Sequence, residues 1–425
     1  MINSSKMHIY PTALAILMKI LVEAYGCSLN HGEAEEFMDG LLGMGHETIE
    51  DQGIADAFIL FTCGVIETTE RHMLKRIAEL ATFPEKKMMV CGCLPNISPE
   101  KILKIAPHAK LVSTGQHMGG LAYFSTGVLA QGHRNSYIGI LPISSGCLGT
   151  CSYCITMTAR GSLHSKSIEE LTSRLEHLIS NGAVEIQLCA QDTAVYGADT
   201  GKNLAQLVQT LGSVEGDFMM RVGMMNPANV IQNLEPIIRA FKSPKVFKFL
   251  HLPVQSGSDA ILENMNRHHT VEEFEVLVRT LRENFPELSF STDIIVGFPG
   301  ETDEDFQSSL GLVKRIKPDI VNITRFSSRP GTEAHAMEDK VPGRIAKDRS
   351  RVMTDLRFSI TGDKYLGFKG RKLRALATER RIEGSTFLRT LNYRPIVIDE
   401  VIDLGKWYDI EITGHAKTHL TGNLL

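Results

Sequence analysis

Three cysteines in one short stretch are the residues of this sequence best suited to chemistry. The segment SSGCLGTCSYC spaces Cys147, Cys151 and Cys154 as Cys-x3-Cys-x2-Cys. Thiolates are the usual ligands of iron–sulfur clusters, and a cubane normally takes four, so three would leave one iron open to a small molecule with amino and carboxylate groups. Zinc would need a fourth Cys or His nearby, but none lies within nine residues of Cys154, and the nearest candidate is His164. The spacing favours a cluster over zinc.

Three more cysteines, Cys27, Cys63 and Cys93, are far apart in sequence, yet each follows a predicted strand. Strands are predicted at Lys19–Glu23, Asp56–Phe61, Met88–Val90 and Lys110–Val112, and helices at Gly32–Met44 and Thr68–Thr82. This alternation predicts a parallel α/β sheet, where ligands gather at the carboxyl ends of the strands. We therefore expect these three thiols to lie together. Cys91 and Cys189 sit within apolar strands, where a free cysteine is usually a small buried hydrophobe.

The middle of the chain repeats strand and helix about six times, after a predicted linker at His133–Tyr137. The predicted strands are Ile138–Ile143, Val184–Cys189, Phe218–Val222, Phe247–Leu252, Leu288–Ile295 and Ile320–Thr324, and the helices between them include Ile168–Ser180, Asn203–Leu211, Ile231–Phe241, Val271–Phe285 and Asp303–Lys314. The pattern is that of a (β/α) barrel with fewer than eight units. A barrel left open at the side suits a large substrate.

A basic helix at Ala346–Tyr365 and a run of short β-like segments end the chain. The segments Lys372–Thr378, Thr386–Leu391, Pro395–Asp399 and Trp407–Thr413 predict a small antiparallel barrel. Residues 342–381 hold 12 Lys and Arg against 4 Asp and Glu, so this segment carries +8 and the rest of the chain −12. Such a segment is either an anion-binding surface or a solvated helix face.

Length and composition agree with two or three soluble domains. The chain has 425 residues, 43% hydrophobic and 22% charged, without an apolar run long enough to span a membrane. The apolar stretch Thr12–Val22 resembles a signal peptide, but no small-residue cleavage site follows, so we interpret its end as the first strand. Met18 would then be the natural start, with residues 1–17 as an extension. Eight cysteines without a targeting signal indicate metal ligands rather than disulfides.

Taken together, the motifs resemble the radical-SAM methylthiotransferases, and most of all their archaeal and eukaryotic branch. The motifs, in order over residues 20–335, are YGCSLNHGEAE, TCGVIETTE, CGCLP, GCLGTCSYCITMTARG, LCAQDTAVYG, HLPVQSGSDAILENMNR, TDIIVGFPGETDEDF and FSSRPGT. The resemblance implies three domains: a flavodoxin-like α/β domain at 18–130, an incomplete (β/α)6 radical-SAM barrel at 133–360 and a TRAM-like RNA-binding β-barrel at 361–425. Two departures from the pattern are Met157, where this branch usually has Lys, and Phe61, where Asn is usual.

The resemblance also implies the cofactors and their ligands. Cys147, Cys151 and Cys154 would hold the [4Fe-4S] cluster that reduces S-adenosylmethionine, and Cys27, Cys63 and Cys93 an auxiliary [4Fe-4S] cluster that presents sulfur. A second S-adenosylmethionine would supply the methyl group. Cys91 competes with Cys93, but the family pattern of Gly-Cys followed by Leu or Met selects Cys93.

Polar residues at strand ends are candidates for S-adenosylmethionine contacts. They are Gln191, Asp192, Gln255, Ser256, Asp293 and Gly297. Each has a plainer interpretation as a turn or helix cap, and Ser258 and Thr302 in particular are placed to cap helices. In the basic segment, Lys369, Arg371 and Lys372 are candidates for RNA phosphates, alongside Lys364, Arg374, Arg380 and Arg381. Phe387, Tyr393, Trp407 and Tyr408 either stack on bases or form the small barrel's own core.

The expected activity is insertion of a methylthio group at C2 of N6-threonylcarbamoyladenosine at position 37 of tRNA, next to the anticodon. An electron donor such as flavodoxin or ferredoxin and a sulfur donor would be needed, and the location would be the cytoplasm. Alternatives are methylthiolation of N6-isopentenyladenosine in tRNA, methylthiolation of a ribosomal-protein aspartate, or a non-enzymatic iron–sulfur sensor that binds RNA.

Overall fold

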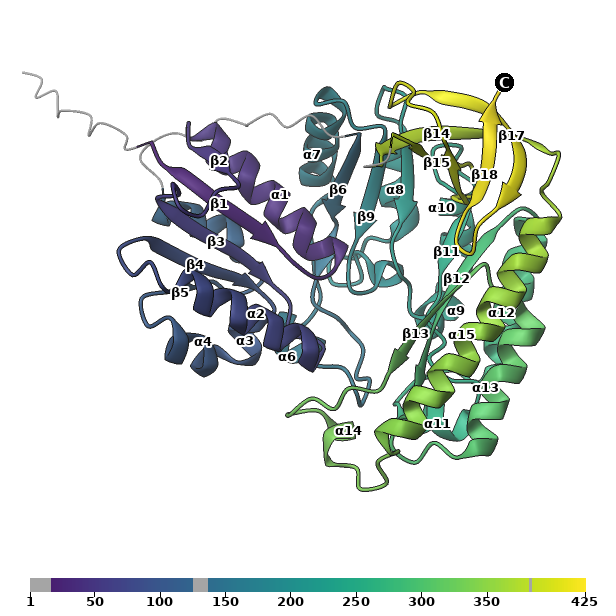
Figure 1. The fold of residues 1–425 in the computed structure, drawn as a ribbon. Helices are drawn as coiled ribbons and strands as arrows, with labels where there is room; N and C mark the ends of the chain where they lie inside the picture. The colour runs from purple at the N-terminus through teal and green to yellow at the C-terminus, as the bar shows by residue number, and fades with distance from the viewer. Residues whose placement is uncertain (1–16, 125–136, 382–383) are drawn as a thin grey trace, which may run out of the picture.

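Three bodies make up the computed structural model, which describes residues 17–124, 137–381 and 384–425 (Figure 1). An N-terminal sheet domain lies beside a central half-open barrel, and a small β-barrel with the C-terminus sits on one end of it. Apart from Leu17 and Tyr137, the predicted N-terminal extension and linker fall outside the described residues. No helix within the described ranges is long and apolar enough to cross a membrane.

The N-terminal domain is a parallel sheet of order β2-β1-β3-β4-β5. Its strands are β1 Lys19–Ala24, β2 Glu47–Ile49, β3 Ala57–Thr62, β4 Lys87–Gly92 and β5 Lys110–Leu111, and its main helices are α1 Ser28–Gly43 and α2 Glu67–Leu80. β3 is buried along its whole length because helices cover both faces of the sheet. The four predicted strands and both helices are confirmed; the short edge strand β2 and the short helices α3 Leu94–Ile97, α4 Pro99–Ile105 and α5 His117–Gly120 were not predicted.

Six parallel strands form the central body, as predicted. They are β6 Ile138–Pro142, β9 Glu185–Cys189, β10 Met219–Val222, β11 Phe249–His251, β12 Ser289–Val296 and β13 Ile320–Arg325. They form two three-stranded sheets, joined between β10 and β11 by the single bridges Met220–Val246 and Met224–His251. This incomplete barrel is the predicted (β/α)6 architecture.

The barrel helices pack outside the strands and begin at polar caps. They are α7 Ile168–Ser180, α8 Leu204–Gly212, α9 Pro227–Gln232, α10 Leu234–Phe241, α11 Asp259–Asn264, α12 Val271–Asn284 and α13 Asp303–Ile316. Ser258 caps α11 and Thr302 caps α13, as the plainer interpretation held. The helix predicted at Ile231–Phe241 is instead two helices, α9 and α10, divided at Asn233.

A long helix, α15 Gly343–Leu366, leads to the closed C-terminal barrel. Its strands are β14 Lys372–Arg380, β15 Thr386–Thr390, β16 Pro395–Ile398, β17 Trp407–His415 and β18 Leu420–Leu424, in the order β14-β15-β16-β18-β17. β18 was not predicted. It closes the barrel by pairing parallel to β16, so the barrel is not wholly antiparallel as expected.

The small barrel packs on the amino ends of the central strands. Leu376 and Tyr393 join Met219, Phe247 and Phe249 in one apolar cluster, and Trp407 packs against it. The Tyr393 hydroxyl donates to the buried Glu185 carboxylate at 2.5 Å. The carboxyl ends, where ligands of such barrels gather, therefore lie at the opposite end from the small barrel.

Candidate functional site

Cys147, Cys151 and Cys154 lie in the loop between β7 (Ser144–Ser145) and α6 (Thr156–Arg160), after the first barrel strand. Gly146 makes this loop possible: its φ is +79°, and a Cβ there would lie 1.9 Å from the Ser162 carbonyl oxygen. The Gly149 amide donates to the Cys147 sulfur at 3.2 Å, and the Thr156 amide donates to the Cys154 sulfur at 3.4 Å. The backbone thus wraps around the thiols, as cluster loops require.

The segment after α11 holds this loop in place. Ser152 donates from its hydroxyl to the Asn264 carbonyl at 2.6 Å, and the Asn266 side chain donates to the Thr150 carbonyl at 2.8 Å. Arg267 donates to the Cys151 sulfur at 3.5 Å and to the Pro253 carbonyl at 2.7 Å. A half-buried cation therefore lies next to the first cysteine triad.

Cys27, Cys63 and Cys93 come together at the carboxyl edge of the N-terminal sheet, after β1, β3 and β4. A Cβ at Gly26 would lie 2.6 Å from Cys63 Cβ, so glycine there lets the Cys27 turn rest against Cys63. The Cys93 amide donates to the Thr62 carbonyl at 2.9 Å. Burial raises the pKa of the Cys93 thiol, and the Cys63 and Cys27 thiols raise it further.

Burial makes four of the six thiols poor anions in the absence of a bound metal. It raises the pKa of Cys147 and of Cys93 to about 11, and also raises the pKa of Cys63 and Cys154. Metal must therefore displace protons to gain thiolate ligands. Two sets of three sulfur donors fit iron–sulfur clusters chemically. In the described ranges no group of His, Cys, Asp or Glu is compact enough to hold a single metal ion.

The remaining cysteines and one family departure belong to the core. Cys91 is fully buried with Phe37 and Phe61 in one apolar cluster, and Cys189 is 4% exposed. Phe61 packs edge-on against Phe37, with ring centroids 5.8 Å apart. Met157 is 44% exposed on α6. Neither departure places a new group among the cysteines.

Three of the candidate S-adenosylmethionine residues serve the protein's own packing and hydrogen bonding. Asp192 accepts from the amides of Ala194 and Asn226 and from the Asn229 side chain at 2.6 Å. Ser256 is fully buried and accepts from the Ser258 amide at 3.2 Å. At Gly297, φ is +75° and a Cβ would lie 2.6 Å from Ala346 Cβ, so glycine there serves the packing of α15.

Gln191, Gln255 and Asp293 remain placed for a ligand. The Gln191 side-chain oxygen is buried with no hydrogen-bond partner in the described structure. Gln255 has a φ of +76°, a conformation uncommon for a residue with a side chain. Its amide donates to the Asp293 carbonyl at 2.9 Å, which joins these two candidates directly.

Two polar residues beside Asp293 were missed from the sequence. His251 on β11 and Asn322 on β13 each lie 2.7 Å from one oxygen of Asp293 on β12. Ile294 and Val296 point to the opposite face of β12 from Asp293 and belong to the apolar core. The three polar side chains therefore share the inner face of the barrel, where they can bind a polar ligand. The alternation of inward-facing and outward-facing residues along β11 and β13 could have predicted these two positions from the sequence.

Lys369, Arg371 and Lys372 are exposed from the end of α15 to the first residue of β14, as a phosphate-binding role requires. Lys364 instead pairs with Asp319 at 3.1 Å, and Tyr393 is buried. A second basic group lines a pocket between α15 and the small barrel. Two of its residues, Arg381 and Phe387, were candidates from the sequence, and the others include Arg357, Arg389, Lys417 and His419.

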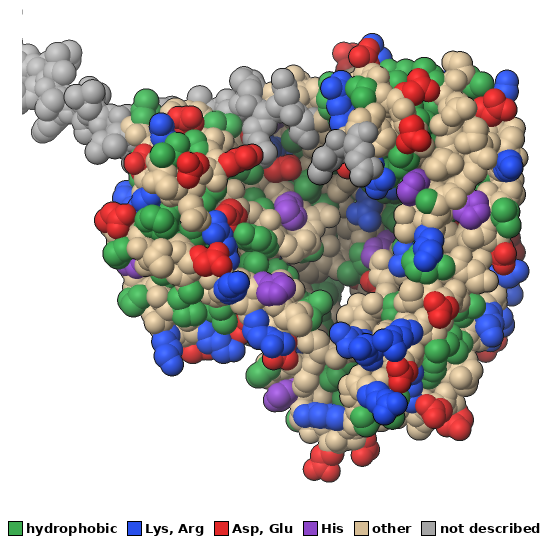
Figure 2. All heavy atoms as spheres, in the orientation of Figure 1, with side chains coloured by type: hydrophobic (Ala, Val, Ile, Leu, Met, Phe, Trp, Pro, Cys, Tyr) green, Lys and Arg blue, Asp and Glu red, His purple; other side chains and the backbone are tan. Residues whose placement is uncertain are grey.

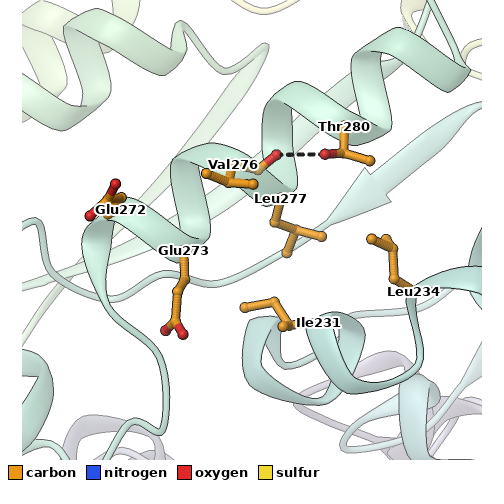
Figure 3. A pocket seen from close by; sticks show the side chains of 7 residues that line it. All are labelled: Ile231, Leu234, Glu272, Glu273, Val276, Leu277 and Thr280. Carbon is orange, nitrogen blue, oxygen red and sulfur yellow. Dashed lines mark hydrogen bonds between the residues drawn. The ribbon is translucent and has the colours of Figure 1, made fainter.

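The surface is hollowed between the N-terminal domain and the central barrel (Figure 2). Lys and Arg side chains gather along one rim of this hollow. A different, open pocket lies between α9, α10 and α12, where Ile231 and Leu277 point toward one another beside Glu273 (Figure 3). None of the candidate site residues lines that outer pocket.

The sequence matches two known families over parts of its length and known proteins over nearly all of it. Residues 141–313 match the Radical SAM superfamily, and residues 19–114 match a family described as Uncharacterized protein family UPF0004. The chain is 39% identical to the probable threonylcarbamoyladenosine tRNA methylthiotransferase of Pyrococcus horikoshii, over 96% of this chain and 100% of that one. It is 32% identical to the human threonylcarbamoyladenosine tRNA methylthiotransferase, over 96% of this chain and 74% of that one.

Solved structures are similar in fold. A radical S-adenosylmethionine methyltransferase, TsrM, from Kitasatospora setae matches with a TM-score of 0.56 and 12% identity, over 74% of each chain. The cobalamin-dependent S-adenosylmethionine radical enzyme OxsB matches with a TM-score of 0.54 and 11% identity, over 81% of this chain and 58% of that one.

Proposed function

The chain belongs to the threonylcarbamoyladenosine tRNA methylthiotransferase family, and on that premise we propose that it inserts a methylthio group at C2 of N6-threonylcarbamoyladenosine at position 37 of tRNA. Similarity over 96% of this chain to an archaeal and to the human member carries this conclusion. It is a radical-SAM enzyme, which removes the non-enzymatic sensor as an interpretation.

We assign Cys147, Cys151 and Cys154 to the radical-SAM [4Fe-4S] cluster and Cys27, Cys63 and Cys93 to the auxiliary [4Fe-4S] cluster. The two thiol groups, each contacted by an arginine, support this assignment. When bound, the clusters and S-adenosylmethionine would supply electron-transfer, radical and sulfur chemistry. This chemistry is needed because ordinary side chains cannot activate the unreactive C2–H bond of adenine.

The chain's own residues bind and orient the reactants. Gln191 and Gln255 at the carboxyl edge of the barrel are assigned to S-adenosylmethionine. Asp293, held by His251 and Asn322, presents its second carboxylate oxygen on the inner barrel face, where it can accept a hydrogen bond from a ribose hydroxyl or an amino group. Asp192 shapes the edge by tying the β9 turn to the start of α9.

The alternatives differ in the molecule that is modified. Methylthiolation of N6-isopentenyladenosine would alter a different tRNA nucleoside, and methylthiolation of an aspartate would alter a ribosomal protein. Mass spectrometry of tRNA nucleosides and of ribosomal proteins from a strain lacking the gene separates the three. The same proposal includes an electron donor such as flavodoxin or ferredoxin, a sulfur donor and a cytoplasmic location.

We assign the C-terminal barrel and α15 to tRNA binding. Replacing Lys369, Arg371 and Lys372 with Glu is expected to weaken tRNA binding, because neutralising a phosphate releases counterions. The dependence of log affinity on log salt should flatten by about 0.9 for every phosphate that the variant no longer binds. Affinity measured at several salt concentrations checks this.

A matched control reverses Arg71, Lys75 and Lys104, which are exposed on the N-terminal domain. It changes net charge equally and should leave the salt dependence near that of the unaltered protein. Equal decreases in affinity in both variants would contradict the assignment. Deleting the barrel is a poorer test, since it would expose Phe247 and Phe249.

A further inference from the structure

Helix α1 presents a row of buried carboxylates to the central barrel. Glu33, Glu36 and Asp39 recur every three residues and are 3%, 8% and 8% exposed, so they form one ridge. Each meets a cation of the barrel: Glu33 meets Arg160 at 2.7 Å, Glu36 meets Lys166 at 2.7 Å, and Asp39 meets Arg174 at 2.6 Å. The ridge therefore joins the two bodies through three ion pairs.

The helix that carries these ion pairs packs tightly against the barrel. Gly32, beside the ridge, lies so near β6 that a Cβ there would come within 2.7 Å of Ile140. Burial would raise the pKa of Glu36, but the hydrogen bond from His117 and the charge of Lys166 lower it. Removing one partner of such a buried pair leaves an uncompensated charge, so the pairs fix how the bodies dock.

Arg160 differs from the other two cations because it also reaches a cluster ligand. Its Nε donates to the Cys93 sulfur at 3.3 Å, and its other nitrogens contact Glu33 and Asn30. Its side chain is 1% exposed. Arg160 ends α6, the helix that follows Cys154, so one short segment of chain carries both a ligand of the first triad and a contact to the second.

We propose that Arg160 is a positioning residue for the auxiliary cluster. It connects this cluster to the radical-SAM loop and raises the reduction potential of the cluster. The proposal rests on the assignment of Cys27, Cys63 and Cys93 to that cluster. A reduced cluster carries one more negative charge, and a buried cation donating to a ligand sulfur favours that form. Arginine suits the position because it stays charged and its planar fork meets Glu33 and Cys93 together.

The neighbouring carboxylate gives the proposal a signature that a purely structural role lacks. Glu33 opposes the charge of Arg160 at the cluster. Arg160→Gln removes the cation and leaves Glu33 unopposed, so the midpoint potential of the auxiliary cluster should fall. Glu33→Gln removes the anion and keeps a hydrogen-bond acceptor for Arg160, so the potential should rise.

The experiment is a redox titration, followed by electron paramagnetic resonance, of full-length protein anaerobically reconstituted with iron and sulfide. Replacing Cys147, Cys151 and Cys154 with Ala in every sample leaves the auxiliary cluster as the only signal. Arg160→Gln, Arg160→Lys and Glu33→Gln are compared with the control Arg174→Gln, which breaks the ridge at Asp39. We expect opposite shifts for Arg160→Gln and Glu33→Gln, an intermediate value for Arg160→Lys, and no shift for Arg174→Gln.

The iron content of each variant distinguishes failure of the proposal for Arg160 from failure of the cluster assignment. If Arg160→Gln alone loses its iron, the positioning role is supported, and Glu33→Gln still reports the potential. Shifts of the same sign in Arg160→Gln and Glu33→Gln, or none in either loaded variant, would overturn the proposal for Arg160 while leaving the cluster assignment intact. Absence of iron in the sample with Arg160 and Glu33 both unaltered would overturn the cluster assignment itself.

Discussion

Replacing Cys147, Cys151 and Cys154 with Ala is expected to remove about half of the iron from reconstituted protein and to abolish cleavage of S-adenosylmethionine. Two cubanes amount to about eight irons, of which this triad holds about four. The loop has no carboxylate or imidazole in its described hydrogen bonds to replace the missing sulfurs. Iron and sulfide analysis with chromatography of deoxyadenosine measures both effects.

Cys189→Ala is the matched control for this triple variant. Cys189 is a buried thiol on β9 of the same barrel, outside both triads, and its replacement should keep the iron and the cleavage activity. If zinc accounted for the metal in anaerobic preparations, or the triple variant kept its full iron, the assignment of this loop would be wrong.

Replacing Cys27, Cys63 and Cys93 with Ala is expected to stop methylthiolation completely while S-adenosylmethionine is still cleaved. The first triad is held by barrel residues, among them Asn264 and Arg267, and these contacts do not involve the N-terminal sheet. Arg160 loses its sulfur acceptor in this variant but keeps Glu33 and Asn30, so the bodies should remain docked. Only the source of sulfur is removed.

Paired assays on one preparation measure this division of labour: deoxyadenosine formation and methylthio-nucleoside formation. Cys91→Ala, next to the triad but buried in the core, is the control that should keep both activities. Loss of both activities from a triple variant that is still folded would show that the triads do not act separately.

Chain order and strand position were enough to predict how the cysteines gather. Each of Cys27, Cys63 and Cys93 follows a strand of one parallel sheet, and parallel strands bring their carboxyl ends to one edge. The strands were predictable because β3 is buried on both faces and its sequence is therefore continuously apolar. The edge strand β2 and the last barrel strand β18 lack that signal, because neither sequence is continuously apolar.

Contacts between bodies were not predictable, because no local pattern encodes them. Glu33, Glu36 and Asp39 have the spacing of a solvated helix face, yet the barrel buries all three. Tyr393 is an aromatic residue of the kind that stacks on bases, but it packs in the apolar interface between the two barrels. Gly297 sits in a motif suited to ligand approach, while its neighbour in space is Ala346, on the much later helix α15. In each case the deciding partner is remote in sequence.

The nucleoside composition of tRNA from a strain lacking this gene tests the central claim most directly. Mass spectrometry of digested bulk tRNA should show loss of 2-methylthio-N6-threonylcarbamoyladenosine and accumulation of N6-threonylcarbamoyladenosine. Both changes should be reversed by the intact gene but not by one encoding Ala at Cys147, Cys151 and Cys154. Unchanged 2-methylthio-N6-threonylcarbamoyladenosine, with loss of a methylthio group from another nucleoside or from a ribosomal protein, would contradict the proposed function.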